Sequence, residues 1–409
     1  MRVLHASKSS EGAYWAVRQV TELVRNGVEV HVALPSACGT AMPGWQASGA
    51  ILHFLDCSLP VRNPIKTGET ISAIRQLVRQ VKPDIIHSHH VTTTMMLRLA
   101  LGRKHPIPRI FQVPGPLHLE HWHTRTAETS LAGKNDFWVA GSQFIKRLYD
   151  RTNVPAANVF MSYHSVDTSL FCTHRTGYLR AKLGIPRRAL VVGNINFIYP
   201  PKRYLGQTVG LKCHEDLIEA INLVQRVRDD VWGVLVGGTF GTRGQYEAKL
   251  RTMAAHQGAG KICMPGRFSC KEVGLSWADF DCAIHVPMSE NCGGVVEPLL
   301  SGVPTVAGDV GGLPEVVVPG LTGKLVPIRR PDLLAEAVLG VLSDLDEQRS
   351  MALRGRELIS IAFDPKRCAG EILHIYRHIL SNEPRPQEFS AARFLERQQP
   401  RAMAAWAGA

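Results

Sequence analysis

Two glutamates on either side of a glycine pair form the segment of this chain whose spacing is best suited to chemistry. Glu290 and Glu297 are seven positions apart, and Gly293 and Gly294 lie between them, where a helix is expected to begin. A helix N-terminus presents unpaired backbone N–H groups and partial positive charge, so it attracts a phosphate. We expect Glu297, in the first helical turn, to accept hydrogen bonds from vicinal hydroxyls. We expect Glu290, in the loop ahead, to bind a second polyol.

A diphosphate with a ribose on one side and a sugar on the other is the chemical outline of a nucleotide-sugar. Gly293 and Gly294 lack the side chains that would keep the backbone away from such a diphosphate. The structural alternative for either glutamate is a carboxylate that stabilises the helix dipole. For Glu297 this alternative and ribose binding are compatible. The segment therefore predicts a nucleotide-sugar site.

Strands on both sides of the segment are expected to position it. Apolar runs predict one strand at residues 282–286, just ahead of the glutamates, and another at residues 305–307, just after them. The chain begins with the same alternation of a strand at residues 2–6, an amphipathic helix at 13–26 and a strand at 28–34. Such alternation predicts an α/β fold in which helices cover both faces of a mostly parallel sheet.

Two series of strands divide the chain into two Rossmann-like domains. We expect an N-terminal domain at residues 1–180 and a C-terminal domain at 181–365, and two such domains facing each other would enclose a cleft. Residues 366–382 are expected to form a helix that crosses back to the first domain, and 383–409 to form a mobile tail. The remaining expected strands are 85–87, 109–113 and 137–140 in the first domain and 190–193, 234–236 and 262–264 in the second.

The composition is that of an ordinary globular protein, with 45% apolar and 20% charged residues among 409. No apolar run approaches the roughly 20 residues needed to span a bilayer, and no apolar signal segment precedes the first strand. The nine cysteines include no Cys-x-x-Cys pair, so neither a disulfide framework nor a zinc site is expected. We expect a soluble, cytoplasmic protein.

The net charge of +12 is concentrated in the first half of the chain. Residues 1–180 hold 20 Lys/Arg against 11 Asp/Glu, whereas residues 181–409 hold 27 against 24. A basic surface could contact an anionic membrane, an acidic substrate or nucleic acid, and a solubilising surface is the structural alternative. Because aromatic and basic residues are not interleaved as in single-strand binders, no nucleic-acid partner is expected.

An ordered series of motifs resembles glycosyltransferase family 4 and covers residues 1 to about 380. The resemblance implies a GT-B architecture and retaining transfer of a sugar from a nucleotide-sugar to a glycan or a lipid-linked acceptor. It implies a place in polysaccharide or envelope assembly, with no metal cofactor. The basic N-terminal half could hold such an enzyme at the inner face of the membrane. The motifs are the loop at Gly12, residues 82–89 (KPDIIHSH), 139–142 (VAGS), 163–171 (YHSVDTSLF), 212–220 (KCHEDLIEA), 265–268 (PGRF) and the donor segment 284–327.

The resemblance assigns roles to individual residues of the donor segment. Glu290 would hold the transferred sugar and Glu297 the ribose, although the family spacing is more often eight than seven. Lys212, expected just ahead of a helix, would stabilise the negative charge of the departing diphosphate. The structural alternative for Lys212 is a solvated surface lysine. For Arg267 the alternatives are a position near the nucleobase or phosphates and an ordinary surface arginine.

The chain departs from the family pattern where an arginine is usual, because that position is Asn194. An insertion of 18 residues, 194–211, separates Gly193 from Lys212. A long loop in a compact domain is usually functional. We therefore hypothesise that Lys202 or Arg203, both within the insertion, replaces the missing cation.

A second departure lies in the first domain, where Pro114 stands in place of a histidine that many family members place beside the sugar. His118 could occupy a similar space. His118, His121 and His123 have no Cys or acidic residue at metal-binding spacing, so they are better explained as part of a loop lining an acceptor site. His87, His89 and His90, at the end of a strand, are expected to be packing or supporting groups.

Two rival functions remain at this stage: a nucleotide-sugar epimerase of the same architecture, and a basic binding protein without catalysis. The register of residues 297–302 (EPLLSG) favours sugar transfer. The predicted catalytic residues are Glu290, Lys212 and His118. The predicted donor-binding residues are Gly12, Lys202, Arg203, Lys212, Arg267, Phe268, Glu290, Asn291, Cys292, Gly293, Gly294 and Glu297, with no metal ligand among them.

Overall fold

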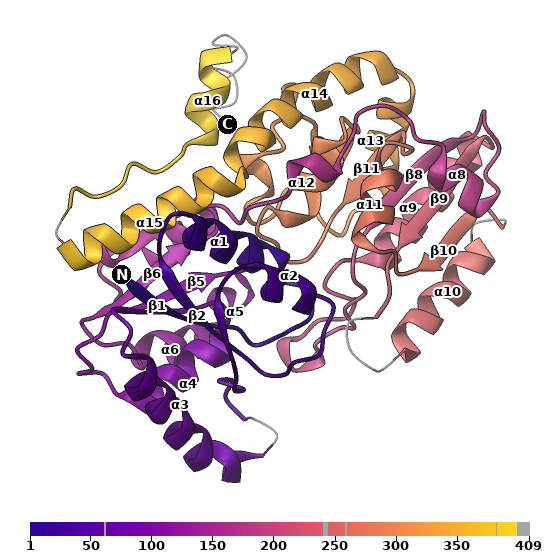
Figure 1. The fold of residues 1–409 in the computed structure, drawn as a ribbon. Helices are drawn as coiled ribbons and strands as arrows, with labels where there is room; N and C mark the ends of the chain where they lie inside the picture. Colours follow the sequence, from indigo (N-terminus) through magenta and orange to yellow (C-terminus); the bar gives the residue numbers. More distant parts are fainter. Residues whose placement is uncertain (61–62, 240–243, 258–259, 382, 399–409) are drawn as a thin grey trace. The chain divides into compact units, whose positions relative to one another are not determined.

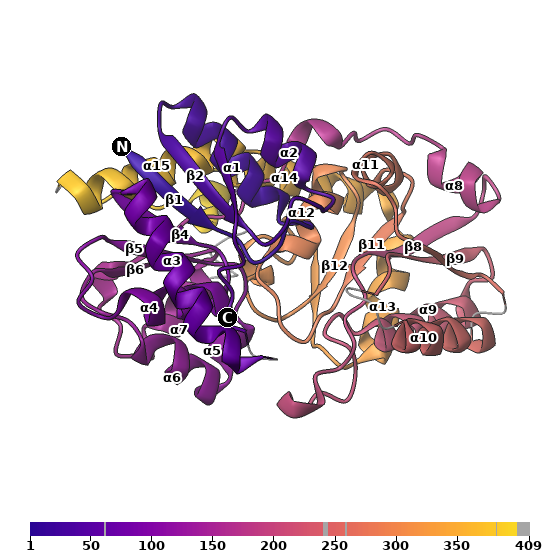
Figure 2. The ribbon, with the colours of Figure 1, turned by 60° about the horizontal axis from the view of Figure 1, so that its bottom comes forward.

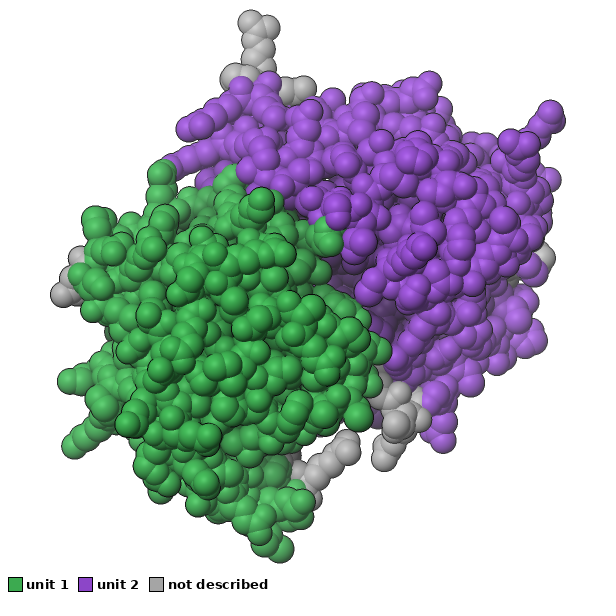
Figure 3. All heavy atoms as spheres, in the orientation of Figure 1, with its two compact units in different colours: residues 1–167, 362–389 green, residues 168–361, 390–409 purple. Residues whose placement is uncertain are grey.

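A computed structural model describes residues 1–60, 63–239, 244–257, 260–381 and 383–398 of the chain (Figure 1). The chain forms two compact units, shown in separate colours in Figure 3. Unit 1 combines Met1–Asp167 with Ala362–Phe389, and unit 2 combines Thr168–Ile361 with Ser390–Ala409. The expected boundary after residue 180 therefore differs from the observed division, which lies after Asp167.

Unit 1 is built on a seven-stranded sheet in the order β3-β2-β1-β4-β5-β6-β7, and every neighbouring pair is parallel. From β1 the chain builds the sheet outward through β2 and β3 on one side and then through β4 to β7 on the other, which is the arrangement of a doubly wound sheet. The strands are β1 (Arg2–Ala6), β2 (Glu29–Leu34), β3 (Ile51–Phe54), β4 (Ile85–Ser88), β5 (Arg109–Val113), β6 (Asp136–Ala140) and β7 (Val159–Met161).

Helices cover both faces of this sheet because both faces are apolar. Val3 and Leu4, adjacent on β1, belong to different buried cores, and so do Ile85 and Ile86 on β4. Successive side chains of a strand point to opposite faces, so each strand contributes to two cores. The helices are α1 (Tyr14–Arg25), α2 (Met42–Ala47), α3 (Thr67–Val81), α4 (Val91–Leu101), α5 (Leu117–Glu120), α6 (Trp122–Ser130), α7 (Gln143–Tyr149) and α15 (Pro365–Ser381).

The helix α15 returns from the C-terminal part of the chain to unit 1. It lies beside α1, as Figures 1 and 2 both show, and α3 lies beside α4. Ile372 and Tyr376 of α15 are fully buried in the same core as Val20 of α1. This burial makes α15 an integral part of unit 1.

Unit 2 contains a six-stranded parallel sheet in the order β10-β9-β8-β11-β12-β13. Its strands are β8 (Leu190–Ile195), β9 (Val231–Val236), β10 (Ile262–Gly266), β11 (Cys282–His285), β12 (Thr305–Gly308) and β13 (Lys324–Val326). Its helices are α8 (Tyr178–Leu183), α9 (His214–Val227), α10 (Gln245–Gln257), α11 (Cys270–Trp277), α12 (Gly293–Leu300), α13 (Pro331–Leu342), α14 (Leu345–Ala362) and α16 (Ala391–Gln398). Short 3-10 helices occur at Pro64–Lys66, Ala156–Asn158, Thr168–Leu170, Arg203–Leu205 and Leu313–Glu315.

The α/β class with two doubly wound sheets is confirmed. The structure differs from the sequence-based expectation at the end of the chain, where a mobile tail was expected from residue 383 onward. Within that stretch Ala391–Gln398 form α16, whose Ala391 and Leu395 are buried. Residues 399–409 of the expected tail lie outside the described residues.

Candidate functional site

The carboxylate of Glu290 is the centre of the candidate site, in the loop between β11 and α12 of unit 2. Its Oε2 accepts hydrogen bonds from Lys212 Nζ and from His285 Nε2, the latter at 2.9 Å. Its Oε1 accepts from the backbone N–H of Asn291 at 3.0 Å, and its backbone carbonyl accepts from the N–H of Gly312 at 3.3 Å. The structure therefore brings the two predicted catalytic residues of this unit together.

Glu290 is ionised at neutral pH despite its burial. Burial by itself would raise the pKa of this carboxyl. The charge of Lys212 and the hydrogen bond from His285 outweigh it and lower the pKa well below its usual range. The side chains of Lys212 and Glu290 are 13% and 12% exposed, so this ion pair can still be reached from solvent.

Lys212 is held beside the glutamate by the end of the insertion. It lies just ahead of α9, as expected, and is followed by the N-cap residue Cys213, which has a left-handed backbone with φ of 49°. The carbonyl of Leu211 accepts a hydrogen bond from the N–H of Met288 at 2.9 Å. This bond ties the segment that carries Lys212 to the loop that carries Glu290.

His285, at the carboxyl end of β11, is a functional candidate that sequence reasoning missed. Its side chain is 3% exposed, and its Nδ1 lies 3.2 Å from Nδ2 of Asn196. A Cβ atom at Gly294 would lie 2.0 Å from Nε2 of His285. The structure thus gives Gly294 a physical role besides the predicted approach to a diphosphate: its missing side chain makes room for the imidazole. The signal available in the sequence was the position of His285 at a strand end, where ligands bind in such sheets.

Gly293, Asn291 and Cys292 lie at the beginning of α12 as predicted. Gly293 is exposed and is the first helical residue, with Cys292 as the N-cap. Cys292 contributes no side-chain cap to the helix, and its Sγ instead donates to the carbonyl of Gly312 at 3.2 Å. The first backbone N–H groups of α12 are therefore not capped by the Cys292 side chain.

The prediction that Glu297 lies in the first helical turn is wrong. The helix α12 begins at Gly293, so Glu297 is its fifth residue and lies in the second turn. Its Oε2 accepts a hydrogen bond from Nε1 of Trp277, the last residue of α11, at 3.0 Å. The indole orients this carboxylate, and no sequence signal identified Trp277.

The insertion contributes aromatic residues near the site. The pKa of the Tyr199 hydroxyl is raised to about 12, first by burial and then by the charge of Glu290. The guanidinium of Arg267, after β10, lies 5.3 Å from the ring of Phe197 and donates to the carbonyl of Thr239. Phe268, the next residue, has Lys182 Nζ 5.2 Å from its ring.

The two cations proposed to replace the family arginine lie on the same insertion. The backbone N–H of Lys202 donates to Oε1 of Gln207 at 3.0 Å, and Arg203 is exposed at the start of a 3-10 helix. Asn194 lies within β8 and is 1% exposed, and its amide atoms have no hydrogen-bond partner among the described residues. The replacement of the arginine by Lys202 or Arg203 stays a prediction.

Unit 1 holds the other two predicted site residues. Gly12 precedes α1 with φ of 64°, and its N–H donates to Oγ1 of Thr40 at 3.3 Å, so a left-handed turn explains this glycine. His118 lies in α5, and burial is the main reason why its pKa is lowered to about 4. His118 is therefore a neutral imidazole at pH 7.

Two of the three histidines expected to be packing or supporting groups, His87 and His89, form a buried cluster with His5 at the carboxyl ends of β1 and β4. The third, His90, instead accepts a hydrogen bond at Nδ1 from the backbone N–H of Lys8 at 3.3 Å. The rings of His5, His87 and His89 stack with centroids 4.6 to 5.0 Å apart. The hydroxyl of Tyr376 lies 2.6 Å from Nδ1 of His87 and 3.2 Å from Nε2 of His5. The cluster therefore joins the sheet of unit 1 to α15.

Two properties of the described residues concern metal ions and membranes. Nowhere in this part of the chain do three or more His, Cys, Asp or Glu side chains come together so that they could hold a metal ion. Of the helices built from these residues, none combines the length and apolarity that crossing a bilayer requires.

Comparisons with known proteins agree with this architecture. The family model described as Glycosyltransferase Family 4 matches residues 13–170, and the model described as Glycosyl transferases group 1 matches residues 203–358. A solved structure of HepE from Anabaena, in complex with UDP and glucose, superposes with a TM-score of 0.77 over 92% of this chain and 99% of that chain. At 19% sequence identity, this likeness shows the fold.

Two relatives are similar in sequence over parts of the chain. The GDP-mannose-dependent alpha-(1-6)-phosphatidylinositol monomannoside mannosyltransferase of Mycobacterium tuberculosis (strain H37Rv) is 31% identical over 165 residues. That alignment covers 38% of this chain and 42% of the relative, so less than half of the mannosyltransferase is matched. The D-inositol 3-phosphate glycosyltransferase of a Nocardioides strain is 25% identical over 72% of this chain and 67% of its own length.

Proposed function

Because the chain belongs to glycosyltransferase family 4 and has the GT-B fold, we propose that it transfers a sugar from a nucleotide-sugar to an acceptor hydroxyl with retention of configuration. The observation that carries this proposal is the ion pair between Lys212 and the ionised Glu290, next to the N-terminus of α12. A cation, a carboxylate and unpaired helix amides are complementary to a diphosphate and to a sugar hydroxyl.

Donor binding would exchange the partners of this ion pair. The diphosphate would accept hydrogen bonds from the first amides of α12 and from Lys212. Lys212 would thereby break its ion pair with Glu290 and form one with the diphosphate. Glu290 would then accept hydrogen bonds from hydroxyls of the transferred sugar, and Glu297 from those of the ribose. The exchange costs little Coulomb energy because Lys212 keeps an anionic partner throughout.

In the transfer step, the bond between the anomeric carbon and the diphosphate oxygen breaks and both electrons leave with the oxygen. The acceptor oxygen bonds to the same carbon from the face that the diphosphate leaves, and the acceptor proton passes to the departing phosphate. Lys212 and the helix amides stabilise the negative charge that develops. Because Lys212 and the helix amides stabilise this negative charge without a metal ion, we expect EDTA to leave turnover unchanged.

The donor is best identified with a panel of UDP-, GDP- and ADP-sugars in thermal unfolding assays. A donor at ~100 times its dissociation constant should stabilise the protein by about 2.7 kcal/mol. GDP-mannose and UDP-glucose are the first to test, because they are named for a relative and for a solved structure of the same fold. No stabilisation by any member of the panel would contradict the proposal.

Product analysis separates transfer from its rivals. A glycosyltransferase releases the nucleoside diphosphate only as an acceptor is glycosylated, apart from slow hydrolysis. An epimerase of the same architecture would convert the donor into its epimer without any acceptor. A non-catalytic binding protein would be stabilised by the donor and yet give neither hydrolysis nor transfer with any acceptor.

For the acceptor, we propose a growing glycan or a lipid-linked intermediate, as in polysaccharide or envelope assembly. The mycobacterial relative is named as a phosphatidylinositol monomannoside mannosyltransferase, and the excess of Lys and Arg in residues 1–180 suits an anionic membrane surface. His118 would lie on the acceptor side. Sedimentation with anionic vesicles at low salt tests the membrane contact, with neutral vesicles as the control. Equal binding to both, or to neither, would contradict the membrane contact.

A further inference from the structure

The site contains a histidine that the transfer step does not itself require. His285 ends β11, and its buried ring lies between two polar groups. Its Nε2 is 2.9 Å from Oε2 of Glu290, and its Nδ1 is 3.2 Å from Nδ2 of Asn196. Asn196 comes from the start of the insertion, directly after β8. One imidazole therefore bridges the insertion and the catalytic loop.

The two neighbours together select one tautomer of this imidazole. The carboxylate of Glu290 is ionised and can only accept, so Nε2 of His285 must carry a hydrogen. A neutral imidazole then has a lone pair on Nδ1, which requires a donor. The amide of Asn196 meets this requirement when its NH₂ group faces the ring, and the structure has that orientation.

The surroundings of the ring keep it neutral. Burial lowers the pKa of His285, and the charge of Lys212 lowers it further, against the raising effect of Glu290. His214, on α9, is also buried near the ring and has its pKa lowered to about 4, so it adds no positive charge at neutral pH. The ring therefore donates to Glu290 without competing with Lys212 for the negative charge.

The ring also has a fixed position, because the helix N-terminus is shaped around it. A methyl group at Gly294 would lie 2.0 Å from Nε2 and 2.2 Å from Cε1 of His285. A Cβ atom at Gly311 would likewise lie 1.9 Å from the backbone carbonyl oxygen of Glu290. These close approaches hold the imidazole and the backbone of Glu290 in one geometry.

We propose that Asn196 and His285 are a positioning pair that holds the Glu290 carboxylate in place when the diphosphate draws Lys212 away. This inference rests on the proposed function. Without the pair, Glu290 would lose its second side-chain donor at the moment when it must present its remaining lone pairs to the sugar. With the pair, the Nε2–H hydrogen bond persists, and the carboxylate keeps the orientation that sugar binding requires.

The tautomer is tested without any donor, by nitrogen-15 NMR of protein labelled in its histidines. The signal of His285 is assigned as the one lost in His285→Gln. We expect the shifts of a neutral ring protonated at Nε2, unchanged between pH 6.5 and 8. A ring protonated at Nδ1, or one that titrates in this range, would overturn the proposal. Because this measurement needs no substrate, it is independent of whether the proposed reaction is correct.

Asn196→Asp sharpens the same measurement, because a carboxylate at position 196 can only accept and requires a hydrogen on Nδ1. We expect the variant to carry a doubly protonated imidazolium whose pKa is raised into the range between pH 6.5 and 8. Asn153→Asp adds the same charge at an exposed position of unit 1 and should leave the signal of His285 unchanged. An unchanged signal in Asn196→Asp would contradict the pairing.

Kinetics of the full chain with the identified donor test the positioning role. His285→Leu replaces the imidazole with an apolar side chain of similar size and removes the Nε2–H that donates to Glu290. As a result, kcat/KM should fall ~10- to 100-fold. His285→Gln retains an N–H near the position of Nε2 and should recover most of this loss. Thermal unfolding midpoints confirm that both variants fold. Wild-type kcat and KM in His285→Leu would overturn the proposal. Inactivity of the wild-type protein with every donor would instead refute the proposed function, and the NMR measurement alone would then decide whether Asn196 and His285 are paired as proposed.

Discussion

Each unit of the molecule contains a cluster of buried ionic side chains, at opposite ends of two similar sheets. In unit 1, Arg98 contacts Glu128 and Asp136, and Asp136 also contacts Arg109 at 2.6 Å. Arg109 and Asp136 are the first residues of β5 and β6, so this cluster lies at the amino ends of the strands. In unit 2, Glu290 follows the carboxyl end of β11. Parallel α/β sheets bind ligands at the carboxyl ends of their strands. The ionic cluster of unit 2 is therefore at the ligand-binding end of its sheet, whereas the cluster of unit 1 is at the opposite end.

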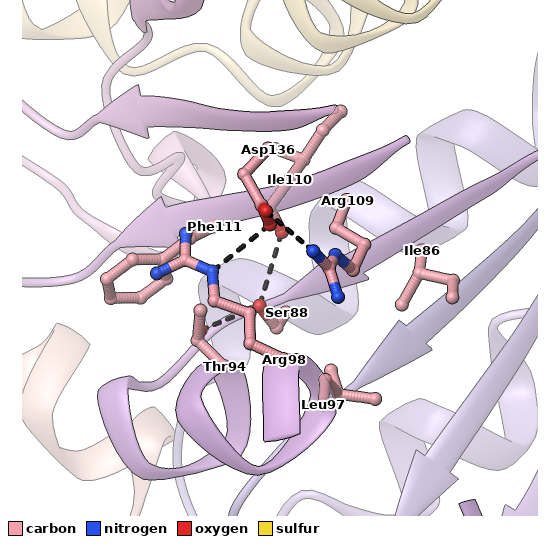
Figure 4. Close-up of a pocket in the computed structure, with 9 residues that line it drawn as sticks. All are labelled: Ile86, Ser88, Thr94, Leu97, Arg98, Arg109, Ile110, Phe111 and Asp136. Atoms are coloured by element: carbon pink, nitrogen blue, oxygen red, sulfur yellow. Dashed lines mark hydrogen bonds and ion pairs between the residues drawn. The ribbon is translucent and has the colours of Figure 1, made fainter. Parts of the chain in front are cut away.

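The two ionic clusters differ in whether their side chains can exchange one another for a ligand. Asp136 and Glu128 are 0% exposed, and Glu128 also accepts from Nε1 of Trp138 at 2.9 Å. Figure 4 shows how Arg98 and Arg109 converge on Asp136 at a small cavity. These three side chains line it together with Ile86, Ser88, Thr94, Leu97, Ile110 and Phe111. In contrast, Lys212 and Glu290 remain partly exposed next to a helix N-terminus. A closed network of this kind stabilises the fold, whereas an open pair can exchange its partners for a substrate.

The sharpest way to break this comparison is to remove the cation of the open pair. Lys212→Met should lower kcat/KM ~100- to 1,000-fold, because the diphosphate loses a positive charge that is positioned for the departing oxygen. The unfolding midpoint should fall less than for removal of a cation from the closed cluster, since Glu290 is partly exposed and keeps the hydrogen bond from His285. Steady-state kinetics and urea unfolding measure the two effects. Lys249→Met, at an exposed position of α10, is the control. Wild-type turnover in Lys212→Met would show that the open pair is not catalytic.

The closed cluster should respond in the opposite way. Arg98→Met removes one cation and leaves two buried carboxylates with too little compensating charge, so the free energy of unfolding should fall by ~3–5 kcal/mol. Equilibrium urea unfolding measures this loss. The exposed Arg103, mutated to Met, should change stability by no more than ~0.5 kcal/mol. A loss of similar size in both variants would contradict a structural role for the cluster.

Acid should destabilise the protein through the histidines of unit 1. Burial lowers the pKa values of His5, His87 and His89 well below those of the unfolded chain. The unfolded chain therefore binds more protons below about pH 6.5, and stability falls as the pH falls through that value. Each such histidine contributes a slope of up to ~1.4 kcal/mol per pH unit, which is absent above pH 7.

Urea midpoints at pH 7.5, 6.5 and 5.5 measure this dependence. His87→Gln should reduce the slope between pH 6.5 and 5.5, whereas the exposed His123, mutated to Gln, should leave it unchanged. A slope that is the same in the two variants and the wild type would show that the buried histidines are not its source.

The smallest effect is expected at the second glutamate. Trp277→Phe removes the indole N–H that orients Glu297, so the KM for the donor should rise ~2- to 10-fold with kcat nearly constant. The exposed Trp122, mutated to Phe, is the matched control for donor binding. A fall in kcat with an unchanged donor KM would place Glu297 in the chemical step instead of ribose binding.

The sequence predicted the strands that are continuous apolar runs. Arg109–Val113 has the predicted bounds because all five residues are buried, as in a central parallel strand. β3, at Ile51–Phe54, was missed because it lies at the sheet edge and is half-exposed, without such a run. β7 and β13 were missed as well, and both are only three residues long.

The site was predictable where its residues are close in sequence and identified by spacing. Glu290 and the start of α12 follow from a local pattern of glutamates and glycines. The pair of Asn196 and His285 joins positions 89 residues apart, and only the sheet register that places β8 beside β11 brings them together. The turn occupied by Glu297 depended on where α12 begins, which spacing alone could not determine.

The central claim is that a diphosphate takes Lys212 from Glu290. A crystal structure of the protein with its donor nucleotide-sugar tests this claim most directly. We expect Lys212 Nζ within hydrogen-bonding distance of a diphosphate oxygen, the diphosphate at the first amides of α12, and Glu290 bound to sugar hydroxyls while it retains His285. A donor bound elsewhere, with Lys212 still paired to Glu290, would contradict the account.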